Sequence, residues 1–535
     1  MEYISGRIVD VVGRKVFKGV ISFEDGVIRD IRESDSVDDC FLMPGLVDAH
    51  VHVESSLLPP AEFARVAMRQ GALAAVADPH EIANVMGVAG VEYMVAEAKS
   101  SPFRFLFAAP SCVPATDFET SGARIDTAEI EQMFSSELVG LLGEMMNFPG
   151  VVNGDLAVLA KIDAAKRYSK PIDGHAPGLS GDMLARYVGA GIGTDHECVS
   201  IVEAIEKIRL GMKVLIRQGS AANNLDELAP LIGMYPDKVM LCTDDMHAEE
   251  ILNGYLRSSL KYLVEKCYDI FDILRSCTLI PVGYYGLDLG LLQVGDSADF
   301  IKVDNLCDFN VQSVFVRGFE IGIGEMEKPV VLNNFKAESI VVADLRVKRK
   351  GDSIRVIGVI NGELLTKQYV YKLKGDDKFV ESNADDDVLK IVVVCRYDRK
   401  QLFVGFVKGF GIKKGAVATS ISHDSHNIIA VGVSDDDLLS AINAIIDAKG
   451  GICFSRKGEV DLLPLPIAGL MSDKSAEYVA EKYASIEKLI KANGSRLSSP
   501  LMNLSFFALL VIPDLKINER GLFDFKTFAF VDLFV

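Results

Sequence analysis

Two histidines near the start of the chain have the spacing of a metal-ligand pair. His50 and His52 lie in the run Asp48-Ala-His-Val-His-Val-Glu54, after an apolar stretch that we predict to be a strand. Residues two apart on a strand face the same side, so both imidazoles could bind one ion. Such a pair also occurs by chance, but the neighbouring Pro44-Gly45 and Asp48 favour a site. We interpret this run as the metal-binding opening of a barrel-type hydrolase.

Two further histidines and a glutamate extend this candidate ligand set. His175 and His196 each close a predicted strand, and singly each could equally be a hydrogen-bonded structural histidine. Together with the first pair they give four imidazoles, which suit two metal ions better than one. Glu144 closes a strand between these positions and has apolar neighbours. We expect it to bridge the two ions rather than to face solvent.

The segment Leu241-Cys-Thr-Asp-Asp-Met-His supplies the last candidate ligand. An aspartate here could bind one ion and take a proton from water, because a metal lowers the pKa of bound water toward neutrality. Successive strand residues face opposite sides, so only one of the pair is placed for this role. We favour Asp244, with Asp245 or His247 orienting the ligands.

Polar residues at other predicted strand ends could contact a substrate. Asp78-Pro-His-Glu81 could supply a ligand or protonate the substrate, although Asp78 could instead cap a helix ahead of Pro79. Among the remaining candidates we expect mostly loop structure, with one or two residues that contact the substrate. These candidates are Ser111, Glu197, Arg217 and Ser220, whereas His80 belongs to the Asp78-Pro-His-Glu81 segment.

Motifs of other catalytic classes are missing from the sequence. There is no G-x-x-x-x-G-K-[ST] run and no strand-linked G-x-G-x-x-G, so nothing indicates nucleotide-phosphate binding. A G-x-S-x-G elbow of a serine hydrolase is also missing. Metal-activated water is therefore the chemistry that the sequence favours.

The spacing of these residues predicts the scaffold that positions them. Eight short apolar segments lead through loops into helical stretches, over roughly 230 residues, as in a (β/α)₈ barrel. Such barrels carry catalytic groups at the carboxyl ends of their strands, where the candidate residues fall. A helix is expected at about 60–70. The predicted strands lie around Leu42 and at 71–78, 103–109, 139–144, 171–175, 191–196, 213–217 and 238–244.

Two further regions flank the predicted barrel. Alternating residues from Gly6 to Ile31, with breaks at Gly13, Gly19 and Asp25-Gly26, are typical of short antiparallel strands. A β pattern at 290–303 could complete the same sheet, and the last region shows a strand at 391–394 and helices near 435–449 and 475–492. We expect a β-sandwich domain at 1–43 and 281–335, a barrel at 44–280 and an α+β domain at 336–535.

The composition limits the cellular compartments and the classes of binding partner that we expect. The 535-residue chain has a formal net charge of -19, which disfavours a nucleic-acid partner. Its nine cysteines include no C-x-x-C pair, as in a reducing compartment. No signal-peptide pattern is visible, and the apolar run 506–512 is shorter than the about 18 residues that span a bilayer. We expect a cytoplasmic protein that binds neither nucleic acid nor membrane.

Longer motifs surround the candidate residues and continue beyond the barrel. They are Pro44-Gly-Leu-Val-Asp-Ala-His-Val-His-Val-Glu-Ser-Ser, Ala77-Asp-Pro-His-Glu-Ile-Ala-Asn-Val, Ser111-Cys-Val-Pro-Ala-Thr, Gly143-Glu-Met-Met-Asn-Phe-Pro-Gly, Asp173-Gly-His-Ala-Pro-Gly-Leu-Ser-Gly, Gly193-Thr-Asp-His-Glu, Cys242-Thr-Asp-Asp, Ser422-His-Asp-Ser-His-Asn-Ile-Ile-Ala and Leu463-Pro-Leu-Pro-Ile-Ala-Gly-Leu-Met-Ser-Asp. In combination they resemble the microbial adenine deaminases of the amidohydrolase superfamily, over nearly the whole chain.

The resemblance implies a distorted (β/α)₈ TIM-type barrel, a flanking β-sandwich and a C-terminal domain, with a site for two divalent ions. Manganese is the first expectation, and iron or zinc are the alternatives. Glu144 would stand in the bridging position, where many relatives use a carboxylated lysine. The implied ligands are His50, His52, Glu144, His175, His196 and Asp244.

One residue departs from the family pattern. The family typically carries Gly-His-Ile after the Thr-Asp-Asp segment, where this chain has Asn253-Gly-Tyr-Leu. If Tyr255 closes the pocket, substrate preference or rate would differ from the family's. The sequence does not say whether His423 and His426 reach the active site.

The activity implied is hydrolytic deamination of adenine to hypoxanthine and ammonia, a purine-salvage reaction, by a metal-activated hydroxide that attacks ring C6. Asp244 would take the proton of the water, and Glu81 or Glu197 would help to protonate ring N1. A homodimer is expected. The alternatives are the same chemistry on another amino-heterocycle or cyclic amide, and a catalytically inert binding or scaffold relative. An inert relative would be expected to lack some of the metal ligands, whereas all six implied ligands are present in this sequence.

Overall fold

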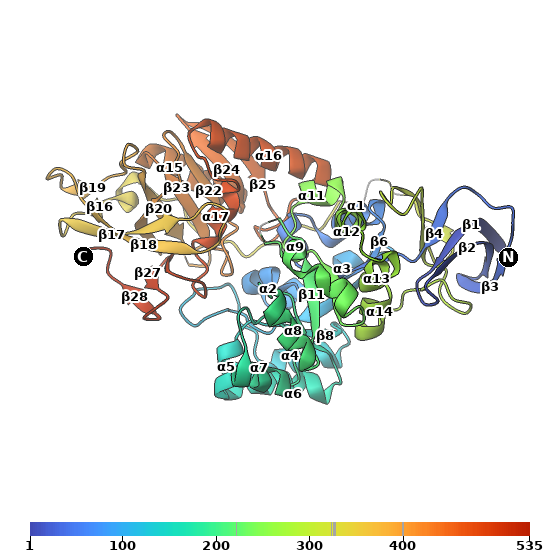
Figure 1. The fold of residues 1–535 in the computed structure, drawn as a ribbon. Coiled ribbons are helices and arrows are strands. Elements are labelled where there is room, and N and C mark those ends of the chain that lie inside the picture. Colours follow the sequence, from blue (N-terminus) through green and yellow to red (C-terminus); the bar gives the residue numbers. More distant parts are fainter. Residues whose placement is uncertain (221, 323, 325–327, 399–400) are drawn as a thin grey trace. The chain divides into compact units, whose positions relative to one another are not determined.

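Residues far apart in the sequence group into two structural units. The computed structural model describes residues 1–220, 222–322, 324, 328–398 and 401–535, and Figure 1 shows their elements. Unit 1 comprises Met1–His80, Val91–Cys112 and Asp126–Pro329. Unit 2 comprises Glu81–Gly90, Val113–Ile125 and Val330–Val535. Two segments of the range 44–280, which we assigned to the barrel, thus group with the C-terminal region.

Unit 1 contains a seven-stranded sheet built from both ends of its sequence. The strand order is β15-β14-β13-β4-β1-β2-β3. Ile8, Ile21, Leu42 and Phe300 are among the buried residues that form its core. The strands are β1 (Glu2–Asp10), β2 (Lys15–Glu24), β3 (Val27–Glu33), β4 (Phe41–Met43), β13 (Phe300–Val303), β14 (Val311–Val316) and β15 (Phe319–Glu320).

The predicted break at Gly19 is wrong. Gly19 lies inside β2 and pairs with Gly6 on one side and Glu33 on the other. A Cβ atom at Gly19 would lie 2.8 Å from the Arg32 carbonyl oxygen. The glycine thus permits close packing within the strand and does not mark a turn.

Parallel strands form the barrel of unit 1. They make two sheets, in the orders β5-β6-β7-β8-β9 and β10-β11-β12. Hydrogen bonds join the sheets at both junctions: Gly193 N donates to Ile172 O at 2.9 Å, and Asp244 N donates to His50 O at 2.9 Å. The strands are β5 (Leu46–Val51), β6 (Ala72–Ala77), β7 (Arg104–Ala109), β8 (Leu141–Met145), β9 (Ile172–Gly174), β10 (Thr194–Asp195), β11 (Lys213–Arg217) and β12 (Val239–Cys242).

The predicted strand around Leu42 is two strands. Strand β4 pairs with β1 and β13 of the seven-stranded sheet, whereas β5 pairs with β6 of the barrel. Pro44-Gly45 separates them, because proline has no N–H to donate to a ladder. The remaining strands follow the predicted positions, and the predicted distorted barrel of the α/β class is confirmed.

Helices follow most barrel strands. The predicted helix at about 60–70 is α1, which begins at Pro60, a residue favoured at the first helical position. Helices α2 (His80–Met86) and α3 (Val88–Ala98) each contain residues of both units. The helices of unit 1 are η1 (Val53–Ser56), α1 (Pro60–Arg69), α4 (Thr127–Ser135), α5 (Phe148–Asn153), α6 (Leu156–Arg167), α7 (Gly181–Gly189), α8 (Ile201–Arg209), α9 (Leu225–Leu228), α10 (Pro230–Met234), α11 (Ala248–Asn253), α12 (Leu256–Glu265), α13 (Ile270–Ser276) and α14 (Leu279–Tyr285).

An eight-stranded sheet forms the centre of unit 2. Its order is β18-β17-β21-β20-β23-β22-β24-β25. Helix α15 buries Leu438, Ile442 and Ile445 in the core beside strands β22 and β23. The sheet strands are β17 (Ser353–Val359), β18 (Thr366–Lys372), β20 (Val388–Val394), β21 (Leu402–Lys408), β22 (Ala416–Thr419), β23 (Ile428–Gly432), β24 (Gly451–Arg456) and β25 (Glu459–Pro464).

Smaller elements complete unit 2. Two of its helices, α15 (Asp435–Ala448) and α16 (Ala476–Ala492), follow the predicted positions. Among the residues that the structure describes, no helix is both long and apolar enough to cross a membrane. The other elements are η2 (Val342–Leu345), α17 (Pro500–Phe506), β16 (Val347–Lys348), β19 (Phe379–Val380), β26 (Leu515–Asn518), β27 (Gly521–Asp524) and β28 (Ala529–Val531).

Candidate metal centre

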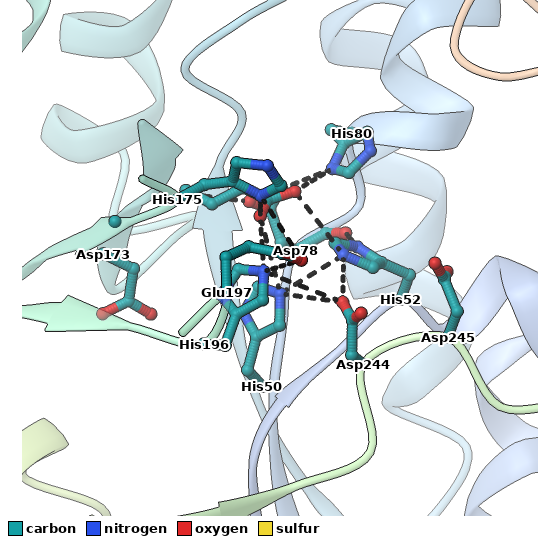
Figure 2. A network of polar contacts seen from close by, with 12 residues as sticks. His50, His52, Asp78, His80, Asp173, His175, His196, Glu197, Asp244 and Asp245 are labelled. Carbon is teal, nitrogen blue, oxygen red and sulfur yellow. Dashed lines mark hydrogen bonds and ion pairs between the residues drawn. The ribbon is translucent and has the colours of Figure 1, made fainter. Parts of the chain in front are cut away.

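Six polar residues from the ends of five barrel strands converge in unit 1. His50 lies on β5 and Glu144 on β8, while His175, His196 and Asp244 follow β9, β10 and β12. Figure 2 shows the side chains of His50, His52, His175, His196 and Asp244 directed toward one another. Because the carboxyl ends of parallel strands meet at one face of the barrel, residues distant in sequence come together there.

Asp244 and the H-x-H pair form one side of the cluster. The Nε2 atoms of His50 and His52 are 3.2 Å apart. Asp244 Oδ1 lies 3.1 Å from His52 Nε2 and 3.5 Å from His50 Nε2. Asp244 has a left-handed backbone with φ of 57°, and it lies beyond the end of β12 rather than within the strand. This turn, and not strand alternation, directs its carboxylate toward the histidines.

Glu144 has the central position of the cluster. One of its oxygens lies 3.0 Å from His175 Nδ1 and 2.9 Å from His196 Nε2. The other lies 3.6 Å from His52 Nε2. The carboxylate therefore contacts one histidine pair and approaches the other, which is the geometry that a bridging ligand requires.

The donor set fits divalent metal ions. Overlapping trios, such as His50–His52–Glu144 and Glu144–His175–His196, each offer ligand atoms within 4.8 Å of one another. Imidazole nitrogens and carboxylate oxygens together suit zinc, iron and manganese. All six side chains except that of His175 are buried, and buried charges are normally paired or bind metal.

The charges of the cluster stabilise one another. Burial opposes ionisation of Glu144, but His175 and His196 outweigh it and hold the pKa of the carboxyl well below its usual value. Burial likewise opposes ionisation of Asp244, yet Arg217 and the histidines keep its pKa well below the usual value. Burial lowers the pKa of His50 to about 4, whereas Glu144 and Asp244 outweigh burial at His196 and raise its pKa to about 9.

Arg217 joins two carboxylates at the edge of the cluster. Its Nη1 donates to Asp244 Oδ2 at 2.6 Å and also to Glu197 Oε1. Glu197 Oε1 in turn lies 3.6 Å from His196 Nε2. We named Arg217 as a possible substrate contact and Glu197 as a possible proton donor, and both lie against the predicted ligands. Arg217 orients the second oxygen of Asp244.

The Asp78-Pro-His segment supports the same cluster. Asp78 Oδ2 accepts a hydrogen bond from Glu144 N at 2.9 Å, and the Asp78 carbonyl lies 2.9 Å from His52 Nδ1. His80 Nδ1 is 3.4 Å from Glu144 Oε1. Ser111 Oγ donates to the Glu144 carbonyl at 2.5 Å. These residues orient Glu144 and His52, so Asp78 does more than the helix capping that we also considered.

Asp245, His247 and Ser220 shape the neighbouring loop. Ser55 Oγ donates to Asp245 Oδ1 at 2.5 Å, and Ser220 N donates to the Asp245 carbonyl at 2.8 Å. His247 N donates to Ser220 Oγ at 2.9 Å. In Figure 2 the Asp245 carboxylate lies apart from the cluster that contains Asp244.

Tyr255 is part of a buried network that sequence reasoning missed. Its side chain is 1% exposed, and its hydroxyl donates to Asp48 Oδ2 at 2.6 Å. Thr243 N also donates to Asp48, at 3.1 Å. Burial raises the pKa of Asp48 to about 6. Tyr255 thus supports the strands that carry His50 and Asp244, and no sequence signal links it to Asp48 across 207 residues.

Glu81 lies in unit 2, where two histidines hold it. His423 Nδ1 is 2.8 Å from Glu81 Oε1, and His426 Nε2 contacts Glu81 Oε2. Burial lowers the pKa of His426 to about 4. His423 and His426, to which we could give no role from the sequence, therefore contact a carboxylate that we predicted to act in catalysis.

Comparisons with known proteins agree with this geometry. The amidohydrolase family model matches residues 41–321, and the model of the adenine deaminase C-terminal domain matches residues 363–529. A protein of Salinibacter ruber named adenine deaminase is 49% identical over 99% of both chains. Proteins of the same name from Parabacteroides distasonis and Methanosarcina mazei are 47% and 45% identical, over 99% and 100% of this chain and 98% and 100% of theirs. The chain belongs to the adenine deaminase family of amidohydrolases.

Proposed function

We propose that this protein hydrolyses adenine to hypoxanthine and ammonia. The observation that carries the proposal is the six-residue cluster at the barrel mouth, in a chain that matches adenine deaminases over its full length. Water supplies the oxygen that replaces the amino group at ring C6, so no redox cofactor is needed. Salvage of purine bases is the role that this reaction would serve.

Two divalent ions are the proposed cofactors. Manganese is our first choice, with iron or zinc as alternatives, because the donor set contains only imidazole and carboxylate groups. Bound ions would supply a nucleophile at neutral pH by lowering the pKa of a water molecule. The proposed ligands are His50, His52, Glu144, His175, His196 and Asp244.

Asp244 is our candidate for the proton acceptor. Its Oδ1 faces the Nε2 atoms of His50 and His52, while its Oδ2 accepts the Arg217 hydrogen bond. Arg217 and the histidines keep this carboxylate ionised, and an ionised carboxylate can accept a proton from water. Arg217 would fix the direction in which Oδ1 points.

Ring N1 of adenine must gain a proton so that C6 accepts the nucleophile. Glu197 and Glu81 remain the two candidates. Glu197 accepts a hydrogen bond from Arg217, whereas Glu81 contacts the imidazoles of His423 and His426. The variants Glu81→Gln and Glu197→Gln separate the roles: the proton donor should lose kcat, and a residue that only orients should mainly change KM.

A substrate panel tests the proposal. Purified protein loaded with manganese should release ammonia from adenine faster than from adenosine, cytosine or guanine, and should not hydrolyse dihydroorotate. Preference for another amino-heterocycle or a cyclic amide would favour the alternative substrate class. Absence of turnover on every compound with manganese, iron and zinc would leave the inert relative as the better account.

Other expectations stay predictions. They are the cytoplasmic location, the homodimer, the lack of nucleic-acid or membrane partners, and the domain bounds 1–43 with 281–335, 44–280 and 336–535. Light scattering of the purified protein tests the dimer, and a monomer at micromolar concentration would contradict it.

A further inference from the structure

A second cluster of metal-ligand side chains lies in unit 2, apart from the six-residue set. It consists of Glu81 on α2 with His423 and His426 on the loop between β22 and β23. One ligand atom from each residue lies within 4.8 Å of the other two. The exposed fractions are 3% for Glu81, 7% for His423 and 1% for His426.

The packing around the cluster holds both imidazoles in place. His423 stacks on Phe506 with ring centroids 4.3 Å apart, and its backbone N donates to the Ser505 carbonyl at 3.1 Å. His426 N donates to the Ser422 carbonyl at 2.6 Å, which closes the turn that contains both histidines. The two rings are therefore positioned before any ion arrives, as a binding site requires.

The spacing of donor atoms matches that of the barrel cluster. There, Glu144 lies 2.9 and 3.0 Å from the nitrogens of His196 and His175. In unit 2, Glu81 lies 2.8 Å from His423 Nδ1 and contacts His426 Nε2. In the absence of an ion, such carboxylate–imidazole contacts are hydrogen bonds, and a metal that binds displaces the shared protons.

The charge balance also allows a divalent cation. Glu81 is one carboxylate ligand, and Asp424 Oδ1 lies 4.0 Å from His423 Nδ1. The positive charge of Arg396 acts on His426 and opposes a cation. Two carboxylates against one guanidinium leave a net negative environment, and two imidazoles with a carboxylate are a common zinc ligand set.

We propose that Glu81, His423 and His426 form an additional site for a divalent transition-metal ion, with zinc as the best fit. The ion would join α2 to the loop between β22 and β23, which are about 340 residues apart in sequence. An ion bound here would occupy the Glu81 carboxylate, which would leave Glu197 as the candidate that protonates ring N1. The test of the site itself needs no turnover.

Metal counting on the full-length protein is the first test. Metal-free protein is loaded with excess Zn²⁺, dialysed, and analysed for zinc per chain by mass spectrometry. Wild type should hold one ion more than a His423→Asn, His426→Gln double variant. The control is Arg167→Lys, which alters an exposed ion pair with Glu131 outside both clusters and should keep the wild-type count. Equal counts in wild type and double variant would overturn the proposal.

Anomalous diffraction from wild-type crystals at the zinc edge decides the case even if the double variant fails to fold. The expected result is a peak within about 2.0–2.3 Å of Glu81, His423 and His426 atoms. Peaks confined to the barrel cluster would show that the three residues form only hydrogen bonds.

Discussion

At the scale of single residues, the cluster depends on side chains that orient other side chains. Arg217 holds Asp244 and Glu197, and Asp78 holds the backbone of Glu144. Partners of this kind fix the direction in which a ligand atom points, and their loss weakens both metal binding and activity.

The variant Arg217→Lys should reduce adenine turnover or metal affinity by about 10- to 100-fold. Lysine keeps the positive charge but cannot hold two carboxylates with one planar group. Steady-state kinetics and a metal titration measure the two effects. The control Arg167→Lys alters an exposed ion pair with Glu131 and should leave both values unchanged. Equal activity of Arg217→Lys and wild type would contradict the orienting role.

The variant Tyr255→Phe tests the buried network around Asp48. Loss of the hydroxyl bond should lower the free energy of unfolding by about 1–3 kcal/mol. Substrate preference should not change, because Tyr255 is buried on Asp48. Denaturant unfolding measures the first effect and the substrate panel the second. A changed preference among purines would instead support the pocket-closing role that we considered from the sequence.

The difference between what sequence predicts and what structure adds is clearest at this scale. All six candidate ligands could be named because each ends a predicted strand of a recognisable barrel. Partners such as Tyr255 for Asp48 and His426 for Glu81 lie 207 and 345 residues apart. Such pairs depend on how distant segments pack, which no local pattern encodes.

At the scale of elements, strand ends determine where chemistry is possible. The apolar runs and their polar ends predicted the barrel strands, because buried parallel strands are almost wholly apolar. The sequence pattern did not predict the break between β4 and β5, and it wrongly predicted a break in β2 at Gly19. Both features depend on which neighbouring strand supplies the hydrogen bonds, and this pairing is determined by tertiary packing.

Strand β26 offers a pH test within unit 2. Burial lowers the pKa of Lys516 to about 7, and its Nζ donates to the carbonyls of Leu364 and Phe506 at 3.0 Å each. Between about pH 7 and its ordinary pKa of 10.5, the unfolded chain holds a proton that the folded chain has lost. Stability should therefore rise with pH in this window.

The slope of that rise can reach about 1.4 kcal/mol per pH unit for one group. Denaturant unfolding from pH 7 to pH 9 should show a steeper rise for wild type than for Lys516→Met, which has no proton to lose. Parallel curves for the two proteins would show that Lys516 stays charged in the folded state.

At the scale of the whole molecule, bound metal should stabilise the folded chain. Ions that bind only the folded state raise stability by mass action, by about 2.7 kcal/mol for one ion at 100 times its Kd. Treatment with a chelator should therefore lower the Tm of metal-loaded wild type, and added Mn²⁺ should restore it. Glu144→Gln should show a smaller shift. An unchanged Tm after complete metal removal would contradict the metal centre.

The full-length likeness to adenine deaminases extends from the barrel into the C-terminal region. The family was predicted from motifs that span this length, whereas the barrel was predicted first from the strand and helix pattern of about 230 residues. The sequence did not predict that residues 81–90 and 113–125 group with the C-terminal region, because these segments interrupt the barrel sequence without a change in composition.

The most direct test of the account compares wild type with Glu144→Gln, both loaded with Mn²⁺ and given adenine. Wild type should form hypoxanthine and ammonia in equal amounts, and the variant should form neither while keeping a native circular dichroism spectrum. The account would be contradicted if wild type consumed no adenine with manganese, iron or zinc. Equal turnover by the variant and wild type would also contradict it.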